Sequence, residues 1–179
     1  MRKFLLLLLA ATIIMSCNNE AAKTEAANDS TMVKNDVPLP YTVSYSSSFK
    51  MGNPEYSAMI LQGSWKDWEM NTMDNMKSWV ADTITVYHSD NAMVKGIDSL
   101  AARWKRGRAK YSAVSTTIDA VMPVYSTDKN ENWVLVWATE IDTNSDGKKD
   151  TSSVMETWRI NKDNKADLLY QFDRAKRKL

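Results

Sequence analysis

The sequence predicts one α+β domain in which three helices pack against a mostly antiparallel sheet. Between residues 53 and 110, apolar side chains recur at spacings of three and four, which is the period of an amphipathic helix. From residue 111 to residue 172, apolar and polar side chains instead alternate in four long segments separated by polar turns, which is typical of strands. Helices followed by a run of strands are the pattern of the α+β class.

Composition excludes several classes of protein. The 179 residues include 23 Lys and Arg against 22 Asp and Glu, so the basic excess of a nucleic-acid-binding domain is missing. One Cys and one His exclude internal disulfides, cysteine-built zinc sites and multi-histidine metal sites. The five glycines lie too far apart to form a phosphate-binding loop. We therefore expect no cofactor and no nucleic-acid partner.

The N-terminus has the features of a secretory signal. Arg2 and Lys3 precede an apolar run over residues 4–15, which is shorter than the roughly 20 residues of a membrane-spanning helix. The following Ile14-Met15-Ser16-Cys17 resembles the bacterial lipobox, although a smaller residue is more usual at Met15. The resemblance implies a lipoprotein signal over residues 1–16, cleaved before a lipidated Cys17. The alternative is a plain signal peptide with an incidental cysteine.

If Cys17 is lipidated, the lipid bilayer is a partner and the protein belongs to the envelope of a Gram-negative bacterium. The residue after Cys17 is Asn18, whereas lipoproteins retained in the inner membrane have Asp at this position. By the same resemblance, Asn18 favours the outer membrane. Residues 17–40 are poor in large apolar side chains, too poor to offset the ordering cost of about 1–2 kcal/mol per residue, and are predicted to be a flexible tether. Residues 41–179 form the domain, which opens with a short extended segment, Tyr41–Tyr45.

Three helices are expected. The first begins with Asn53 as N-cap and Pro54 in the first turn. A second, short helix follows, and the third is capped by Asp98, with basic side chains over Arg103–Lys110 mostly facing solvent. We interpret these apolar stripes as core residues, and the alternative interpretation, a cofactor-binding surface, is less favoured. Their members are Leu61, Trp65 and Trp68 in the first helix, Met73, Met76 and Trp79 in the second, and Leu100, Ala101 and Trp104 in the third.

A short strand over Thr83–His88 precedes the third helix and places Ile84, Val86 and His88 on its more apolar face. Four longer strands follow, and the first of them is expected to break near Pro123. These strands are Tyr111–Tyr125, Asn132–Asp142, Thr151–Ile160 and Ala166–Phe172.

Three segments together resemble the nuclear transport factor 2-like superfamily, in its SnoaL-like and ketosteroid-isomerase-like branch. They are residues 79–88, the pair Gly96-Ile97 that opens the third helix, and the Asp146-Gly147 turn. The resemblance spans residues 53–173 and implies a curved sheet wrapped around a helix to form a cone. It further implies a small apolar ligand in the mouth of the cone and a homodimer formed through the sheet.

The resemblance also suggests site residues. His88 occupies the position of the general base of the isomerases, and Glu156 lies near that of their second acid. The catalytic tyrosine of those enzymes falls near Ser64, with Tyr56 two turns earlier, so it is not reproduced. The candidate catalytic pair is therefore His88 and Glu156, without the tyrosine.

Elementary chemistry supports the same pair. Glu156 alternates with Val154 and Trp158, so on an inward face its carboxyl would favour the protonated form and donate a hydrogen bond. His88 could act as a base near neutral pH. The alternatives are a hydrogen-bonded core histidine and a glutamate that faces solvent or pairs with Arg159. Candidate ligand-binding residues are Tyr56, Trp65, Ile84, Val86, Trp137 and Trp158.

A possible calcium loop runs over residues 142–150. Its oxygen ligands would be Asp142, Asn144, Asp146 and Asp150, with a glycine at the sixth position. The twelfth position is Ser153, where a bidentate glutamate is expected, and strands flank the loop where an EF-hand has helices. A hairpin turn explains the same residues and is favoured, so no metal is expected.

Three functions remain open from the sequence. The first is a tethered module that binds a small apolar or amphipathic molecule without catalysis. The second is an isomerase-, cyclase- or dehydratase-type enzyme with His88 as base and Glu156 as acid. The third is a protein-interaction or dimerisation domain, which predicts a cone filled by its own side chains.

Overall fold

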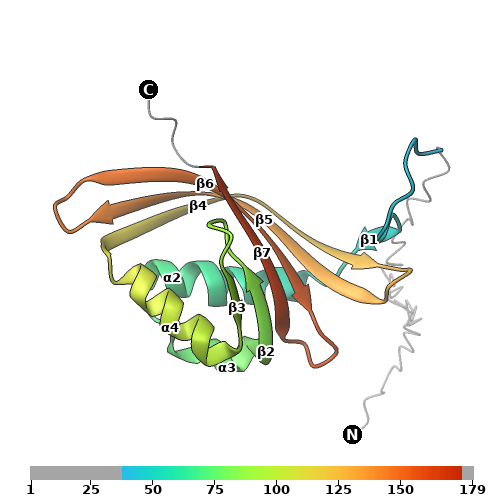
Figure 1. Cartoon of the computed structure of the whole chain (residues 1–179), viewed down its shortest axis with the longest axis horizontal. Helices are drawn as coiled ribbons and strands as arrows, with labels where there is room; N and C mark the ends of the chain where they lie inside the picture. The colour runs from blue at the N-terminus through green and yellow to red at the C-terminus, as the bar shows by residue number, and fades with distance from the viewer. Residues whose placement is uncertain (1–37, 175–179) are drawn as a thin grey trace, which may run out of the picture.

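The computed structural model describes residues 38–174 and contains three helical units and one seven-stranded sheet. The helices lie together on one face of a curved sheet (Figure 1). This confirms the predicted α+β class. In chain order the elements are β1 (Phe49–Met51), α1 (Pro54–Ile60), the π-helix η1 (Leu61–Lys66), α2 (Asp67–Met70), the short 3₁₀-helix η2 (Met73–Asn75), α3 (Met76–Trp79), β2 (Val80–Tyr87), β3 (Met93–Lys95), α4 (Ile97–Arg108), β4 (Tyr111–Ser126), β5 (Glu131–Asn144), β6 (Lys149–Ile160) and β7 (Ala166–Arg174).

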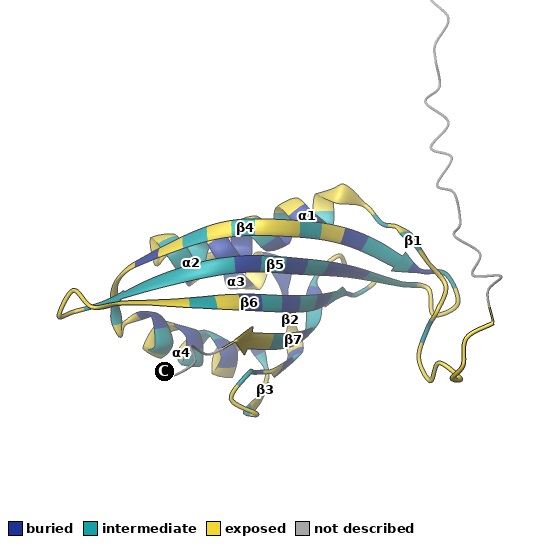
Figure 2. Ribbon diagram, turned by 90° about the horizontal axis from the view of Figure 1, so that it is seen from above, coloured by how far each residue is buried: buried dark blue, intermediate teal, exposed yellow. Residues whose placement is uncertain are grey.

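The sheet has the strand order β1-β4-β5-β6-β7-β2-β3. The long strands β4 to β7 form an antiparallel meander, and β2 joins β7 in parallel. Seen from above, the middle of β5 and β6 is buried over the helices, whereas much of β4 is exposed (Figure 2). The short strands β1 and β3 at the two edges were not predicted. Each has only three residues, too few for alternation to be recognised.

The first helical unit begins as predicted, because the side chain of Asn53 accepts a hydrogen bond from the backbone N–H of Glu55 at 3.0 Å. It differs from prediction in the middle, where residues 61–66 widen into the π-helix η1 between α1 and α2. Gly63 explains part of this packing. A Cβ at Gly63 would lie 2.4 Å from Cε2 of Trp79, so the helix and the Trp79 ring approach more closely than any other residue would permit.

The turn into α4 corrects one prediction. The N-cap is Gly96 and not Asp98, and its φ of 83° lies in the left-handed region that glycine adopts without strain. Gly96 also donates its N–H to the carbonyl of Ile84, which ties the helix start to β2. Asp98 instead lies in the first turn of α4, where an acid is favourable near the positive end of the helix dipole.

Pro123 does not break β4, contrary to prediction. Its carbonyl accepts the N–H of Gly52 at 2.9 Å, on the side facing β1. The nitrogen of a strand residue points to the same side as its carbonyl, so the missing N–H of Pro123 costs no hydrogen bond with β5. The irregularities of β4 lie instead between Tyr111 and Ala113 and between Ile118 and Ala120.

The core lies between the helices and the concave face of the sheet. Trp158 of β6 is fully buried at its centre, and its ring meets Trp79 of α3 and Trp104 of α4 edge to face, with centroids 5.5 and 6.3 Å apart. Ile84 and Val86 of β2 are also fully buried, as their alternation predicts. The apolar stripes are therefore core residues, although several of their members also border the pocket described below.

The segment before β1 is less regular than predicted. Tyr41–Tyr45 forms no strand, and Tyr41 is 83% exposed. Tyr45 does contact the domain, because its ring lies edge to face with Trp133 and its hydroxyl donates to Glu131. The predicted signal, the lipidated Cys17 and most of the predicted tether lie outside the described residues. Within residues 38–174, no helix is long and apolar enough to cross a membrane.

Candidate functional site

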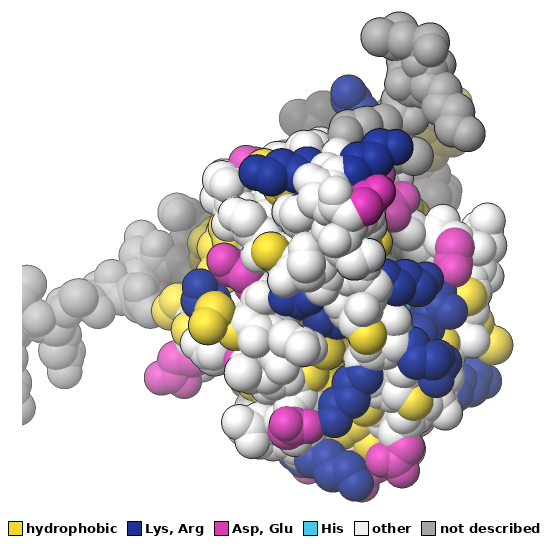
Figure 3. Space-filling view, turned by 90° about the vertical axis from the view of Figure 1, so that its left-hand side faces the viewer, with side chains coloured by type: hydrophobic (Ala, Val, Ile, Leu, Met, Phe, Trp, Pro, Cys, Tyr) yellow, Lys and Arg dark blue, Asp and Glu magenta, His cyan; other side chains and the backbone are white. Residues whose placement is uncertain are grey.

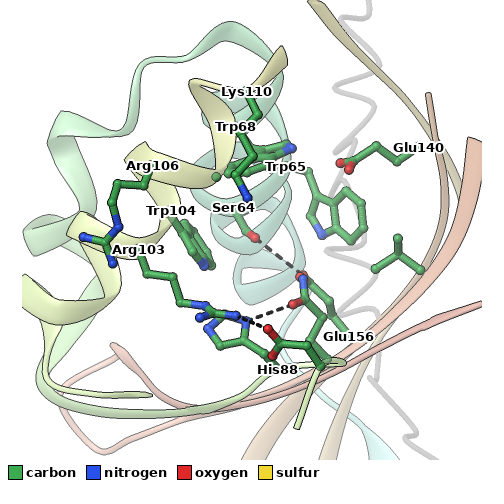
Figure 4. Close-up of a pocket in the computed structure, with 14 residues that line it drawn as sticks. Ser64, Trp65, Trp68, His88, Arg103, Trp104, Arg106, Lys110, Glu140 and Glu156 are labelled. Atoms are coloured by element: carbon green, nitrogen blue, oxygen red, sulfur yellow. Dashed lines mark hydrogen bonds and ion pairs between the residues drawn. The ribbon is translucent and has the colours of Figure 1, made fainter. Parts of the chain in front are cut away.

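A pocket of about 460 Å³ opens between α4, the first helical unit and the concave face of the sheet. Ser64, Trp65 and Trp68 line it from η1 and α2. Glu140, Val154, Glu156 and Gln171 line it from strands β5, β6 and β7. His88 and Asp90 follow the end of β2, and α4 supplies Arg103, Trp104 and Arg106 from the opposite wall (Figure 4).

Glu156 lies at the deep end of this pocket and is only 3% exposed. One carboxyl oxygen, Oε2, accepts the indole N–H of Trp158 at 2.9 Å and the hydroxyl of Ser64 at 3.4 Å. The other, Oε1, accepts the amide N–H of Gln171 at 3.1 Å. Burial raises the pKa of Glu156 to about 7, against the opposing effect of these hydrogen bonds. The inward orientation that the alternation of β6 predicts is therefore confirmed.

His88 lies beside Glu156 and is joined to it through Gln171. Its Nδ1 is 3.0 Å from the amide oxygen of Gln171. Its Nε2 is buried and has no hydrogen-bond partner among residues 38–174. Burial lowers the pKa of His88, and Gln171 opposes that shift. The ring is therefore neutral at physiological pH, with one buried nitrogen that makes no hydrogen bond among the described residues.

An ion pair closes the pocket near His88. Arg103 Nη2 lies 2.6 Å from Asp90 Oδ2. The backbone N–H of Ala92 and then Arg103 lower the pKa of Asp90, so this carboxylate stays charged. Because Asp90 takes up much of the charge of Arg103, the cations left for an incoming group are Arg106 and Lys110.

Glu140 forms the outer sheet wall of the pocket. Burial, followed by the nearby charges of Asp142 and Glu156, raises its pKa to about 8. Glu140 is therefore largely protonated at neutral pH and can donate a hydrogen bond. Two carboxyl groups of the pocket thus change charge in the range where cells operate.

The basic side chains over Arg103–Lys110 mostly face solvent, as predicted, but several of them also border the pocket and Arg108 is buried. Arg103, Arg106 and Lys110 all border the pocket, and Lys and Arg side chains gather on this end of the molecule (Figure 3). Arg108 is 6% exposed and donates to the carbonyls of Trp68, Glu69 and Tyr111 at 2.8–3.1 Å. It therefore donates to two carbonyls at the end of α2, of which the Trp68 carbonyl also accepts the backbone N–H of Asn71.

The sequence matches none of the protein-family models and none of the curated proteins with which it was compared. Solved structures do match. A nuclear transport factor 2-like protein of unknown function from Exiguobacterium sp. 255-15 is 16% identical over 64% of this chain and 97% of its own, with a TM-score of 0.54. A SnoaL-like protein of unknown function from Burkholderia thailandensis E264 is 10% identical, over 70% and 99%, with a TM-score of 0.53.

This chain has the nuclear transport factor 2-like fold. An LEH-like epoxide hydrolase from M. tuberculosis shares it, at 11% identity over 67% of this chain and 84% of its own, with a TM-score of 0.53. Identities this low show the fold alone, because one scaffold hosts many functions. The family resemblance read from residues 79–88, Gly96-Ile97 and the Asp146-Gly147 turn is thus confirmed at the level of the fold.

Within this nuclear transport factor 2-like fold, the predicted site residues fall into three groups. His88, Glu156 and Trp65 come together at the pocket. Ile84, Val86 and Trp158 are core residues that do not line it. Tyr56 donates its hydroxyl to Asn164 at 2.6 Å, away from the pocket, and Trp137 lies on the opposite face of the sheet beside Phe172.

The segment from Asp142 to Asp150 is a β-hairpin. Asn144 and Lys148 pair across the turn, and Gly147 has a φ of 81°, which fits the predicted turn. Asp146 accepts the backbone N–H of Lys148. Among residues 38–174, no cluster of three or more His, Cys, Asp and Glu side chains is arranged to hold a metal ion.

Sequence reasoning missed Gln171, Glu140 and the pair of Asp90 with Arg103. Gln171 had a signal, because it alternates with the buried Leu169 of β7 and must share its inward face. Glu140 shares the face of β5 that carries the buried Val136 and Ala138. Apolar residues also lie on the other face of this strand, so the sequence does not show which face points inward. The approach of Asp90 to Arg103 depends on how α4 packs beside the β2–β3 hairpin, which the sequence pattern does not encode.

Proposed function

We propose that this domain binds a small amphipathic molecule, with its apolar part against the tryptophans and an anionic group at Arg106 and Lys110. The observation that supports this most strongly is the open pocket with His88 and Glu156 in its wall. Its volume of about 460 Å³ lies within the range of roughly 300–1,000 Å³ of ordinary ligand sites.

The lining favours an amphipathic ligand over a wholly apolar one. Trp65, Trp68 and Trp104 supply the flat apolar surface on which a ring or chain would lie. Arg106 and Lys110 at the rim attract an anion. A purely apolar ligand would bury these polar groups without partners, which is costly.

We further propose that the domain is anchored to a membrane through lipidated Cys17, in the envelope of a Gram-negative bacterium and at its outer membrane. This proposal rests on the sequence of residues 1–18. The Cys17→Ser variant should lose the mass of the attached lipid and move from the membrane fraction to the soluble fraction. A variant that stays in the membrane fraction would contradict lipid anchoring at this residue.

Anilinonaphthalene sulfonate is a suitable probe of the pocket, because it joins an aromatic body to an anionic group. The full chain should bind it saturably, with a rise in probe fluorescence and quenching of the pocket tryptophans. The double variant Arg106→Glu, Lys110→Glu should weaken binding about tenfold or more, since reversing each rim charge costs on the order of 1 kcal/mol. The matched control is Lys148→Glu, Lys149→Glu, in the β5–β6 hairpin away from the pocket, which should change affinity less than about twofold. Equal effects of the two variants would refute the rim as the anion site.

Catalysis by an isomerase-, cyclase- or dehydratase-type enzyme is the second candidate, and one observation favours it. His88 Nε2 is a buried, unpartnered nitrogen on a neutral ring beside a carboxyl whose pKa is about 7. These are suitable properties for a base and an acid. Once a substrate is found, His88→Ala should abolish turnover and leave the fold intact. Unchanged turnover would remove His88 from the mechanism.

A protein-interaction domain is the weakest of the three functions, because it predicts a cone filled by its own side chains, and the open pocket counts against this. A homodimer through the outer face of the sheet is compatible with either other function. Phe172 is 58% exposed on that face and Tyr170 is stacked on Tyr87 there. We propose this dimer separately from the ligand-binding pocket.

A further inference from the structure

Three side chains from three segments form a continuous chain of hydrogen bonds at the pocket wall. His88 follows β2, Gln171 lies on β7 and Glu156 on β6. The amide of Gln171 contacts Nδ1 of His88 with its oxygen and Oε1 of Glu156 with its nitrogen, at 3.0 and 3.1 Å. Gln171 is thus the only described link of this kind between the histidine and the buried acid.

The directions of these hydrogen bonds follow from the chemistry of the groups. The indole N–H of Trp158 can only donate, so Oε2 of Glu156 must accept it. An ionised carboxylate accepts at both oxygens, so the Gln171 group facing Oε1 must be the amide N–H. The amide oxygen of Gln171 then faces His88 and requires a proton on Nδ1. A neutral ring carries one proton, and Nε2 is left as an acceptor.

We propose that Gln171 is a positioning residue that transmits the charge state of Glu156 to His88, and that an ionised Glu156 thereby leaves Nε2 of His88 as the unprotonated nitrogen of the ring. The neutral imidazole of free histidine prefers its proton on Nε2, so the protein reverses the intrinsic preference.

The other charged groups near His88 do not fix its tautomer. Arg103 of α4 and Asp90 of the β2–β3 turn act on the ring through their charges and are paired with each other at 2.6 Å. Glu140 of β5 also lines the pocket, where the charge of Glu156 raises the pKa of Glu140. Within residues 38–174, Gln171 is the hydrogen-bond partner of Nδ1, so it decides which nitrogen carries the proton.

Replacing Glu156 by Gln should reverse the whole chain of donors. Trp158 still donates, so the new amide must place its oxygen at the former Oε2 and its N–H₂ toward Gln171. The amide of Gln171 then turns over, accepts from residue 156 and donates to Nδ1 of His88. The proton of the histidine then moves to Nε2.

The chain has one histidine, so nitrogen NMR of labelled histidine in the full chain reports His88 alone. The ligand-free wild-type protein at about pH 9, where Glu156 is ionised, should show Nδ1 protonated and Nε2 unprotonated. Glu156→Gln should show the opposite tautomer. Glu140→Gln makes the same chemical change in the same pocket but outside the hydrogen-bond chain, and should leave the wild-type pattern. Gln171→Leu should return the ring toward the Nε2-protonated form of free histidine.

A wild-type ring protonated at Nε2 would overturn the proposal, even if every variant failed to fold. A folded Glu156→Gln protein with Nε2 still unprotonated would overturn it as well, as would a Gln171→Leu protein that keeps the wild-type tautomer. None of these measurements involves a ligand. Failure of this proposal is therefore distinguishable from failure of the proposed function, which the binding titration tests.

Discussion

The buried carboxyl of Glu156 should make the protein less stable as the pH rises. The folded state raises its pKa from 4.5 to about 7, so between these values the folded chain binds a proton that the unfolded chain has released. Stability that is present at low pH is then lost as the pH rises through the folded pKa. Each pKa unit corresponds to about 1.4 kcal/mol, which gives a loss of about 3 kcal/mol from this one group between about pH 4.5 and 8.5.

The assay is urea unfolding of the wild type and of Glu156→Gln at the two ends of this pH range. Replacing Glu156 should reduce the fall in unfolding free energy by about 3 kcal/mol, because the variant has no proton to lose there. Glu55→Gln, an exposed change in the first turn of α1, controls for the loss of a carboxylate as such. A pH dependence that Glu156→Gln alters by less than about 1 kcal/mol would refute the assignment of a buried, nearly neutral acid.

Three further perturbations test the packing and the outer face. Arg108→Met removes the side-chain donor to three carbonyls and should cost about 2–4 kcal/mol in urea unfolding, whereas a cost below about 1 kcal/mol would contradict a structural role for Arg108. Gly63→Ala places a Cβ 2.4 Å from the Trp79 ring and should cost about 1–3 kcal/mol or more in the same assay; an unchanged midpoint would contradict this close approach. Phe172→Glu should convert a dimer to monomers in sedimentation velocity, and a dimer that survives would exclude this face as the interface.

The predictions that succeeded rest on local patterns. Alternation placed Ile84 and Val86 on the inward face of β2 and His88, just after the strand, on the same side. The same rule turned Glu156 toward the core. The cap at Asn53 was recognisable because its side-chain chemistry and the proline after it act within one turn of helix.

The predictions that failed depend on contacts between distant segments. Gly96 replaces Asp98 as the N-cap because the chain turns sharply out of β3, and this geometry suits only a residue free to adopt positive φ. Pro123 is accommodated because β1, which is remote in sequence, pairs on that side of β4. Arg108 is buried because the end of α2 lies against α4, where its carbonyls need a donor.

The candidate site was predicted in part for the same reason. His88 and Glu156 were found one by one from strand alternation, but their link through Gln171 is a property of the order in which β6, β7 and β2 pair. The polar character of the pocket mouth was also missed, because periodicity alone does not separate a basic helix face in solvent from one that borders a cavity.

The most direct test of ligand binding in this pocket is to titrate anilinonaphthalene sulfonate into the histidine-labelled full chain and follow His88 by NMR. Because the sequence has one histidine, its signals report the pocket wall and nothing else. We predict that they shift saturably, with the same dissociation constant that the fluorescence titration gives. Fluorescence that saturates while the His88 signals stay in place would mean that the probe binds elsewhere, and would contradict the pocket as the binding site.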